Sequence, residues 1–358
     1  MLLPIWYLIS WVIYRQQSFS DFLLGGYGRG TGFLSLVGVL LTFLLISQKI
    51  ETNFDKLFKY TYYTLFLALI HGVLQFFSLD PISWANNTTG LYLTTGNTNF
   101  ASTFLGILSI FLIMHFFVAG TRLRIILGIL ILINVLLILN TKSSQGFLIF
   151  IFNLTFATLV MSRVGLKLFS KKKPGNRTVL FVTLILSIIY VISQFWNLRE
   201  LVLNLRTDLQ IDSRLSYWRI GYEIGKDNIM FGVGKDQLFY FSPEYLNELY
   251  SKRIMELTSI DKSHNVILDH FANGGLIAAL VWILFCVLIF KCILNLLSEN
   301  NLKITKWKLF PFISIWITYF FQSMISPDDL LLTLLGITSA GVIYGLNGVN
   351  NKKRVQNI

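Results

Sequence analysis

The chain has 358 residues, of which 54% are hydrophobic and only 13% are charged, and its mean hydropathy is +0.64. About 25% of the residues of ordinary soluble domains are charged, so this composition excludes that class. The formal net charge of +12 alone would fit a nucleic-acid-binding protein. The basic residues lie in loops between apolar runs, however, and no nucleic-acid-binding motif occurs, so we expect no nucleic acid partner.

Apolar runs that approach or reach the length of a membrane span recur along the chain. A helix needs about 20 apolar residues to cross the hydrocarbon core of a bilayer. We therefore predict an all-α, polytopic integral membrane protein of about ten transmembrane helices. The runs lie near residues 1–14, 32–47, 60–77, 100–119, 124–140, 145–162, 178–196, 275–297, 309–325 and 329–347. The first run lacks the basic start and the small-residue cleavage site of a signal peptide, so we expect a helix there too.

Basic residues collect in alternate loops between the runs. The short loops on the other side hold only Arg15, Arg29 and Lys142. The positive-inside rule therefore places both termini in the cytoplasm and the long polar segment 197–270 outside. The basic loops contain Lys49, Lys56, Lys59, Arg122, Arg124, Arg163, Lys167, Lys171, Lys172, Lys173, Arg177, Lys291, Lys303, Lys306, Lys308, Lys352, Lys353 and Arg354.

This topology divides the chain into three parts. Residues 1–196 form an N-terminal region of seven spans, residues 197–270 an extracytoplasmic loop, and residues 271–358 a C-terminal region of three spans with a short cytoplasmic tail. The loop is rich in Tyr, Trp, Phe, Leu and Ile, unlike disordered segments, so we expect it to be folded. A protein that inserts many helices and has one large folded loop is expected to carry its activity in that loop.

Two amphipathic helices are predicted within the loop, each lying against the membrane surface. The first covers 213–225 and is capped by Ser213, and the second covers 243–258. The turn Gly232-Val233-Gly234 separates them. The apolar face expected for the first helix consists of Leu215, Trp218 and Tyr222.

The cysteine and histidine residues do not predict a metal site, and we expect no cofactor. Cys286 and Cys292 fall six residues apart in one span, where they do not face each other and are read as core residues. The histidines are spread over three regions without metal-ligand spacing. For His71 and His115, within predicted spans, hydrogen bonding between helices is expected rather than catalysis.

Arg214 is the first candidate for chemistry in the loop. A guanidinium group is permanently charged and its planar donors fit phosphate oxygens in pairs. Arg206 and Arg219 would add positive charge near the bilayer. The alternative is a surface arginine that pairs with Asp212 or with lipid phosphates.

His264 is the second candidate, and the amide of Asn265 follows it. An imidazole titrates near neutral pH, so it can accept a proton from a sugar hydroxyl or bind a phosphate. The alternative is an ordinary interfacial residue. Four polar residues of other outer loops could hold sugars, although turn formation is their more common role: Asn97, Asn99, Asp328 and Asp329.

The order of these motifs resembles that of the O-antigen ligase and polymerase family of bacterial envelope glycosyltransferases. The motifs are Gly96-Asn97-Thr98-Asn99 before a span, Thr141-Lys142-Ser143, Arg214 to Trp218, Phe231-Gly232-Val233-Gly234, His264-Asn265 and Gly274-Gly275-Leu276-Ile277. The resemblance runs from about residue 90 to 345 and implies a bacterial plasma (inner) membrane location.

The resemblance also implies a reaction. A glycan linked to undecaprenyl diphosphate is the donor, an acceptor hydroxyl attacks its first sugar with inversion, and neither a metal nor a nucleotide sugar is needed. Arg214 would hold the departing diphosphate. His264 would contact the diphosphate or activate the acceptor, and both roles stay open. Substrate contacts are expected from Asn97, Asn99, Arg206, Trp218, Arg219 and Asn265.

The acceptor is a second lipid-linked oligosaccharide in a polymerase, or a lipid A core, wall polymer or protein in a ligase. Membrane lipid and envelope assembly proteins are further expected partners. Many members have Arg at the position of Gln145, and Ala278 stands where a second Gly is usual. An inactive member that serves as an assembly partner is therefore one alternative. A polysaccharide transporter or flippase is another, although its helices would carry polar midplane residues and repeated halves.

Overall fold

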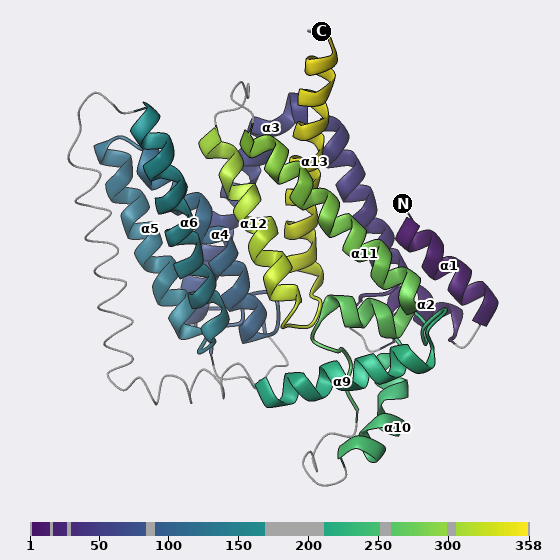
Figure 1. Ribbon diagram of the computed structural model, residues 1–358. Coiled ribbons are helices and arrows are strands. Elements are labelled where there is room, and N and C mark those ends of the chain that lie inside the picture. The colour runs from purple at the N-terminus through teal and green to yellow at the C-terminus, as the bar shows by residue number, and fades with distance from the viewer. Residues whose placement is uncertain are drawn as a thin grey trace. The chain divides into compact units, whose positions relative to one another are not determined.

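The computed structural model describes residues 2–14, 17–26, 30–83, 90–168, 211–250, 259–298 and 306–356, which contain helices and no strand (Figure 1). The prediction of an all-α fold is confirmed. The helices are α1 Leu2–Tyr14, α2 Phe19–Leu24, α3 Phe33–Phe76, α4 Thr98–Val118, α5 Thr121–Asn140, α6 Ser144–Leu168, α9 Ile211–Asp227, α10 Leu238–Tyr250, α11 Val266–Ser298, α12 Lys306–Ser323 and α13 Leu330–Gln356.

Six helices of the described part are long and apolar enough to cross a membrane, namely α3, α4, α5, α6, α11 and α13. The chain is thus a polytopic membrane protein. α1 is a shorter apolar helix, α12 is not among the six, and the span expected at 178–196 lies outside the described residues. The total of about ten spans is not confirmed by the described helices, because the single helix α3 takes the place of two expected spans.

α3 differs from the expected pair of spans, because a single helix runs through both 32–47 and 60–77. The intervening residues 48–59 are polar but include neither glycine nor proline. Polar residues of this kind end an apolar run without ending a helix. The hydropathy pattern therefore predicted a loop where the structure has a continuous helix.

The chain divides into two compact units, and the boundary crosses α3 after Phe54. The first unit comprises Met1–Phe54, Ile211–Leu302 and Trp316–Ile358, and the second comprises Asp55–Gln210 and Lys303–Ile315. α1, α2, α9, α10, α11 and α13 thus belong to the first unit. α4, α5 and α6 belong to the second.

In the second unit, α4 packs against α5 and α6 and is buried along most of its length. A Cβ added to Gly106 would lie 2.6 Å from the carbonyl oxygen of Gly146 on α6, so the two backbones touch where both side chains are absent. Beside this contact Asn153 Nδ2 donates to the Gly106 carbonyl at 2.8 Å, and Ser314 Oγ donates to Asn153 Oδ1 at 2.6 Å. Small residues and buried amides are the usual means of joining helices in a membrane.

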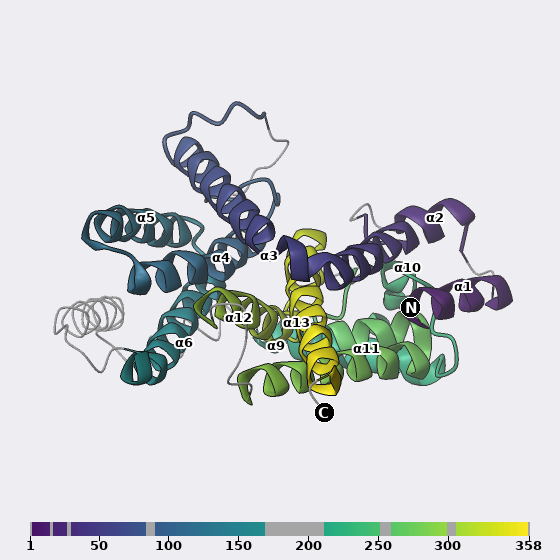
Figure 2. The same cartoon turned by 90° about the horizontal axis from the view of Figure 1, so that it is seen from above.

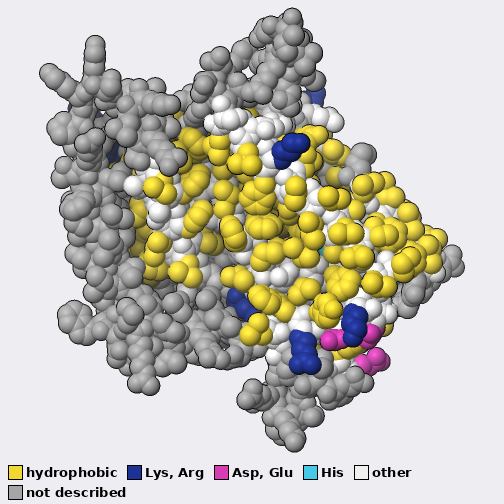
Figure 3. All heavy atoms as spheres, viewed as in Figure 1, with side chains coloured by type: hydrophobic (Ala, Val, Ile, Leu, Met, Phe, Trp, Pro, Cys, Tyr) yellow, Lys and Arg dark blue, Asp and Glu magenta, His cyan; other side chains and the backbone are white. Residues whose placement is uncertain are grey.

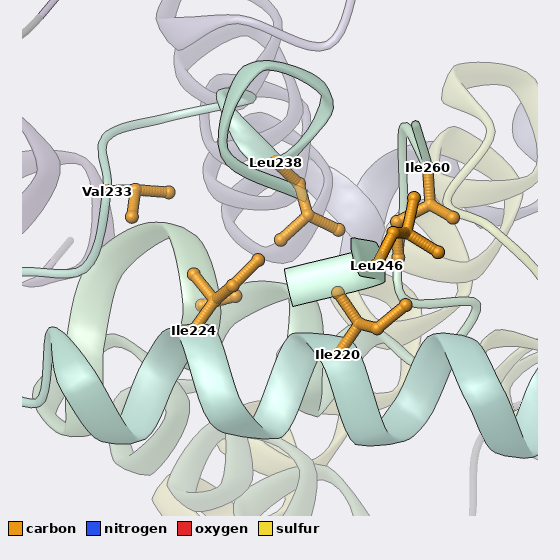
Figure 4. Packing of buried hydrophobic residues seen from close by; sticks show 7 residues of the cluster. Ile220, Ile224, Val233, Leu238, Leu246 and Ile260 are labelled. Carbon is orange, nitrogen blue, oxygen red and sulfur yellow. The ribbon is translucent and has the colours of Figure 1, made fainter. Parts of the chain in front are cut away.

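In the first unit, α9 lies across the ends at which α11 and α13 begin, and α10 lies beside it (Figures 1 and 2). We call α9, α10 and the segments 228–237 and 259–265 the loop layer. Its core is a cluster of buried aliphatic side chains from α9, α10 and both segments (Figure 4). The labelled members are Ile220, Ile224, Val233, Leu238, Leu246 and Ile260. The expectation that residues of this loop are folded holds for the described ones.

The start of α9 differs from the prediction. Ser213 lies inside the helix, which the structure has from Ile211, instead of capping it. Ile220 and Ile224 face the core, whereas Leu215 and Tyr222 are 53% and 51% exposed. α9 therefore has an apolar side on both faces, and periodicity alone does not say which of them is buried.

Exposed apolar side chains also cover the outward side of α11, as expected for a helix in contact with lipid (Figure 3). They include Leu276, Leu280, Leu284, Val287 and Leu294. Their spacing of about one helical turn gives a single stripe.

α11 begins at Val266, earlier than the expected span 275–297, and is broken at Gly275. Gly275 has φ 71° and ψ −172°, which is not helical. The glycine pair that was interpreted as the entry to a span is therefore a kink within a longer helix. The described part of the segment 197–270 thus ends in the first turns of α11, which contain Asp269 and His270.

The kink is held together by the turn Gly232-Val233-Gly234. The carbonyls of Ala272 and Asn273 accept hydrogen bonds from the amides of Val233 and Gly234, at 2.9 and 3.0 Å. The amide of Leu276, which would bond Ala272 in an unbroken helix, donates to Ile229 at 2.8 Å. The turn therefore replaces the backbone hydrogen bonds that the break removes.

We predict that Gly275→Ala destabilises the protein by at least about 3 kcal/mol, because the backbone region of Gly275 is restricted to glycine. An added Cβ would also collide with the carbonyl oxygen of Met230. Unfolding of the detergent-solubilised protein measures the effect. Gly38→Ala is the control, since Gly38 lies in α3 with open space around it. Equal stability of the two variants would contradict the interpretation of the kink.

Candidate functional site

The first unit brings the predicted residues Arg214, Trp218, His264 and Asn265 into one region of the loop layer. The ring of Tyr217 packs on the ring of His264 with a centroid distance of 4.7 Å. Trp218 Nε1 donates a hydrogen bond to the backbone carbonyl of His264 at 3.2 Å. Because Arg214 precedes these two aromatic residues by one helical turn, it lies on the same side of α9.

Arg214 is buried, with 7% of its surface exposed. Its Nε atom is buried and has no hydrogen-bond partner among the described residues. Burial lowers the pKa of Arg214, and the neighbouring Tyr217 opposes that shift. An arginine stays charged at neutral pH in spite of such shifts, and a buried donor without an acceptor is costly, which makes this group suited to bind an anion.

His264 sits in a loop whose backbone is fixed on both sides. The residue itself has φ 54°, in the left-handed region that non-glycine residues rarely adopt. On its N-terminal side, the amide of Ser263 donates to Asp269 Oδ1 at 2.6 Å. The backbone around His264 is therefore held in an unfavourable conformation by contacts to α9 and α11, and such strain is frequent at functional sites.

On the C-terminal side of His264, Asn265 caps α11. Its Oδ1 atom accepts hydrogen bonds from the amides of Ile267 and Leu268, at 3.0 and 3.2 Å, which is the pattern of an N-cap. Its Nδ2 atom donates to the carbonyl of Met324 at 3.2 Å. These contacts show a positioning role, and a contact of Asn265 with substrate stays a prediction.

A buried ion pair lies two residues before His264. The ammonium group of Lys262 contacts the carboxylate of Asp236 and donates to the hydroxyl of Thr31 at 3.1 Å. The side chains of Lys262 and Asp236 are only 4% and 2% exposed. This pair joins the His264 loop to the segment after the Gly-Val-Gly turn and to the residues that precede α3.

The charges in this pair change each other's protonation. Burial alone would raise the pKa of Asp236, but Lys262 and Lys235 outweigh it and lower that pKa to about 2. Burial disfavours the charged form of Lys262, yet Asp236 and Asp269 raise its pKa on balance. For Lys235, burial and the charge of Lys262 lower the pKa. Both members of the pair are therefore charged at neutral pH.

The sequence model of a protein family described as O-antigen ligase matches residues 88–283, which is more than half of the chain. The chain belongs to the O-antigen ligase family. No curated protein matches it. The predicted resemblance is confirmed, and the matched range includes the loop layer with Arg214 and His264.

Membership identifies the chain as a bacterial membrane protein of surface polysaccharide biosynthesis, of the ligase or polymerase type of glycosyltransferase. Its substrates are accordingly a lipid-linked glycan and an acceptor.

The remaining predicted residues lie elsewhere. Arg219 is exposed on α9, and Arg206 lies outside the described residues. Asn97 and Asn99 belong to the second unit, where Asn97 caps α4 and its side chain accepts from the amide of Asn99 at 2.8 Å. Gln145, in the same unit, is buried and accepts a hydrogen bond from Thr103 at 3.3 Å.

The histidines of the second unit make structural contacts. His71 Nε2 lies 3.2 Å from Asp80 Oδ1, in the loop after its own helix, so its partner is not another helix as expected. His115 packs on Tyr62 and Trp307, with ring centroids 5.5 and 5.6 Å away. His115 therefore contacts the helices that carry Tyr62 and Trp307 through ring packing.

Sequence reasoning missed Lys262 and Asp236. Both positions adjoin a recognised motif, since Asp236 follows the Gly-Val-Gly turn and Lys262 precedes Ser263-His264-Asn265. Charged residues beside loop motifs are usually solvated, so only the three-dimensional contact identifies this pair.

We predict that Lys262→Met destabilises the protein by about 3–5 kcal/mol, because it leaves the carboxylate of Asp236 buried without its cation. Unfolding in detergent measures the loss. Lys226→Met is the matched control, since Lys226 forms an exposed pair with Glu223 on α9 and little change is expected there. A similarly small effect at Lys262 would show that the buried pair is not needed.

The same pair predicts a pH dependence. The pKa of Asp236 is about 2 in the folded protein, below its usual 3.8, so its contribution is complete above about pH 4 and is lost as the pH falls towards 2. In Asp236→Asn this loss should be absent between pH 4 and 2.

Proposed function

We propose that the protein transfers or polymerises an undecaprenyl-diphosphate-linked oligosaccharide at the outer face of the plasma membrane, with inversion at the first sugar and without a metal. The observation that supports this most is the buried Arg214, with an unpartnered Nε atom, one helical turn from the residues that contact His264. Both residues lie in the range that matches the O-antigen ligase family.

Arg214 is proposed to bind the diphosphate. A buried cation without an anion is unfavourable, and a bound diphosphate would supply the missing charge and acceptor. As the bond between sugar and diphosphate breaks, negative charge grows on the departing oxygen. A guanidinium already in place stabilises that charge without rearranging, which lowers the barrier.

His264 is proposed to act beside Arg214 in one of two ways. It either accepts the proton of the attacking acceptor hydroxyl or donates a hydrogen bond to the diphosphate. The first role requires a neutral imidazole and the second a proton on the ring nitrogen that faces the phosphate. The fixed backbone of this loop supports both roles, because either one requires a stationary ring.

The other site residues are assigned to substrate recognition. Trp218 and Arg219 on α9 would contact the sugar and lipid headgroup, and Arg206, Asn97 and Asn99 would add further polar contacts. Asn265 would contact the substrate beside His264. We place the loop layer outside the cell and both termini in the cytoplasm, and we expect envelope assembly proteins as partners.

A transfer assay with purified protein and an undecaprenyl-diphosphate oligosaccharide tests the proposal. Arg214→Ala and His264→Ala should each lower the rate by about 100-fold or more, the scale for removing one transition-state donor. Arg214→Lys should also fail, since an ammonium cannot make the paired contact. Lys226→Ala, on the exposed side of α9, should keep wild-type activity.

Product that lengthens without an added acceptor identifies a polymerase, and a requirement for another acceptor identifies a ligase. Folding of each variant is checked by unfolding in detergent. A folded Arg214→Ala protein with wild-type turnover would contradict the role in diphosphate binding.

The orientation has its own test. A cysteine at Asn247, in α10 of the loop layer, should react with a membrane-impermeant reagent added to intact cells. The native Cys286 and Cys292 are free but buried, so the wild-type chain serves as the unlabelled control. Labelling only after the cells are opened would overturn the outward placement.

A further inference from the structure

The backbone of His264 is fixed, but a fixed backbone alone does not orient the imidazole ring. Asp269 binds the amide of Ser263, and Asn265 caps α11, so the chain is held on both sides of the residue. The ring can still rotate about χ1 and χ2, each of which has more than one minimum. A proton acceptor and a phosphate donor both need a ring nitrogen at a set position. Either role of His264 therefore requires a contact that orients the ring.

The ring of Tyr217 provides such a contact. Its centroid lies 4.7 Å from that of the His264 ring, and the two planes are inclined by 45°. This distance is at the short end of the range for interacting rings, so a rotation of the imidazole would break the contact. The next residue, Trp218, bonds the backbone carbonyl of His264 through Nε1. Two consecutive side chains of α9 thus hold His264, one by its ring and the other by its backbone.

Tyr217 is itself held in place by the loop layer. It packs against the cluster of buried aliphatic side chains, which includes Ile220 on the same helix (Figure 4). A Cβ added to Gly221 would lie 2.2 Å from the hydroxyl oxygen of Ser263, so the backbone of α9 lies directly against the loop that carries His264. The fold therefore determines where the ring of Tyr217 stands relative to this loop.

The hydroxyl of Tyr217 lies among charged groups of the same region. Burial first, and then the charge of Asp261, raise the pKa of Tyr217, and Arg214 opposes that shift. The phenol is therefore neutral at neutral pH, and it does not compete with an anion for the guanidinium group. Tyr217 thus interacts with both Arg214 and His264, the two residues to which the chemistry is assigned.

We propose that Tyr217 is a positioning residue, which sets the orientation of the imidazole ring of His264 for the transfer reaction. The inference rests on the proposed function, which assigns the chemistry to Arg214 and His264. The contribution belongs to the aromatic ring of Tyr217, because the ring is the part that packs on the imidazole. The alternative is a tyrosine that only fills space in the loop layer, and the two roles lead to different results.

Replacing the ring tests the proposal on activity. Tyr217→Leu should lower kcat about tenfold, the effect of a misplaced catalytic group that costs about 1.4 kcal/mol in the transition state. Tyr217→Phe keeps the ring and should restore most of this loss. Tyr222→Leu is the matched control and should keep the wild-type kcat. Tyr222 lies on the same helix, but it is 51% exposed and its ring contacts Phe271 at 6.2 Å.

A double-mutant cycle shows whether Tyr217 acts through His264. The variant that combines Tyr217→Leu with His264→Ala should be no slower than His264→Ala alone, because the ring that Tyr217 orients is then absent. A further loss of about tenfold in the double variant would show that the two residues act independently, and it would overturn the proposal.

The ring contact is also measurable by NMR without the reaction. The chain has four histidines, so labelling with ring-¹³C histidine gives few signals, and the signal missing in His264→Ala belongs to His264. The ring current of Tyr217 acts on this signal at the observed distance. The signal should therefore shift in Tyr217→Leu and keep its place in Tyr217→Phe. An unchanged signal in Tyr217→Leu would contradict the positioning role.

Unfolding in detergent confirms that each variant is folded. Tyr217→Met, whose flexible side chain fills part of the space of the ring, replaces Tyr217→Leu if that variant does not fold. Absence of transfer by the wild-type protein with every donor and acceptor would overturn the proposed function and, with it, this role of Tyr217. Wild-type transfer that is lowered equally by Tyr217→Leu and Tyr217→Phe, or by neither, would overturn only this inference.

Discussion

The first unit depends on one exchange of backbone hydrogen bonds, at the break of α11. A helix that crosses a membrane satisfies its own amides and carbonyls, and a break inside it leaves several of them without partners. Here the amides of Val233 and Gly234 bond the freed carbonyls, and the carbonyl of Ile229 accepts from the freed amide of Leu276. Trp6 Nε1 further donates to the carbonyl of Gly274 at 2.6 Å.

The same exchange determines where the loop layer lies. The segment that bonds the break is the connection between α9 and α10, so repairing the helix fixes both layer helices against it. The side chain of Asn273 extends the attachment, since its Oδ1 atom accepts from the amide of Gln237 at 3.0 Å. Position 232 requires glycine because a Cβ there would collide with the backbone of Asn273. Position 275 requires it because a Cβ there would collide with the carbonyl oxygen of Met230. The motif Phe231-Gly232-Val233-Gly234 therefore has a structural explanation that is independent of substrate.

Two buried cations in the loop layer illustrate different uses of charge. Lys262 has a carboxylate and a hydroxyl as partners, so its burial joins three segments of the unit. Arg214 is also buried, but its Nε atom has no acceptor among the described residues. A buried cation with two partners stabilises the fold, whereas a buried cation with an unpartnered donor is a candidate site for an anion. This contrast separates the structural cation from the candidate catalytic one.

The sequence predicted those features that depend on local pattern. The apolar runs predicted the all-α membrane fold, and the two glycines of Gly232-Val233-Gly234 predicted the turn. The order of the motifs predicted the family. Three features depended on packing and were missed. A polar stretch without glycine or proline continued as the helix α3, and the second apolar side of α9, with Ile220 in the protein core, was not predicted. Asp236 and Lys262 stand far apart in sequence, and only the fold brings them into contact.

Three unfavourable features of the described chain lie in the first unit. His264 has a left-handed backbone, Gly275 interrupts a membrane helix, and Arg214 is buried with an unpartnered donor. Folding alone would favour removing each of them, so they persist only because the surrounding contacts compensate. Local conflicts of this kind are expected at functional sites, where geometry is held for a ligand. Their occurrence near the start of α11 therefore supports the proposed site at the junction between the loop layer and the membrane helices.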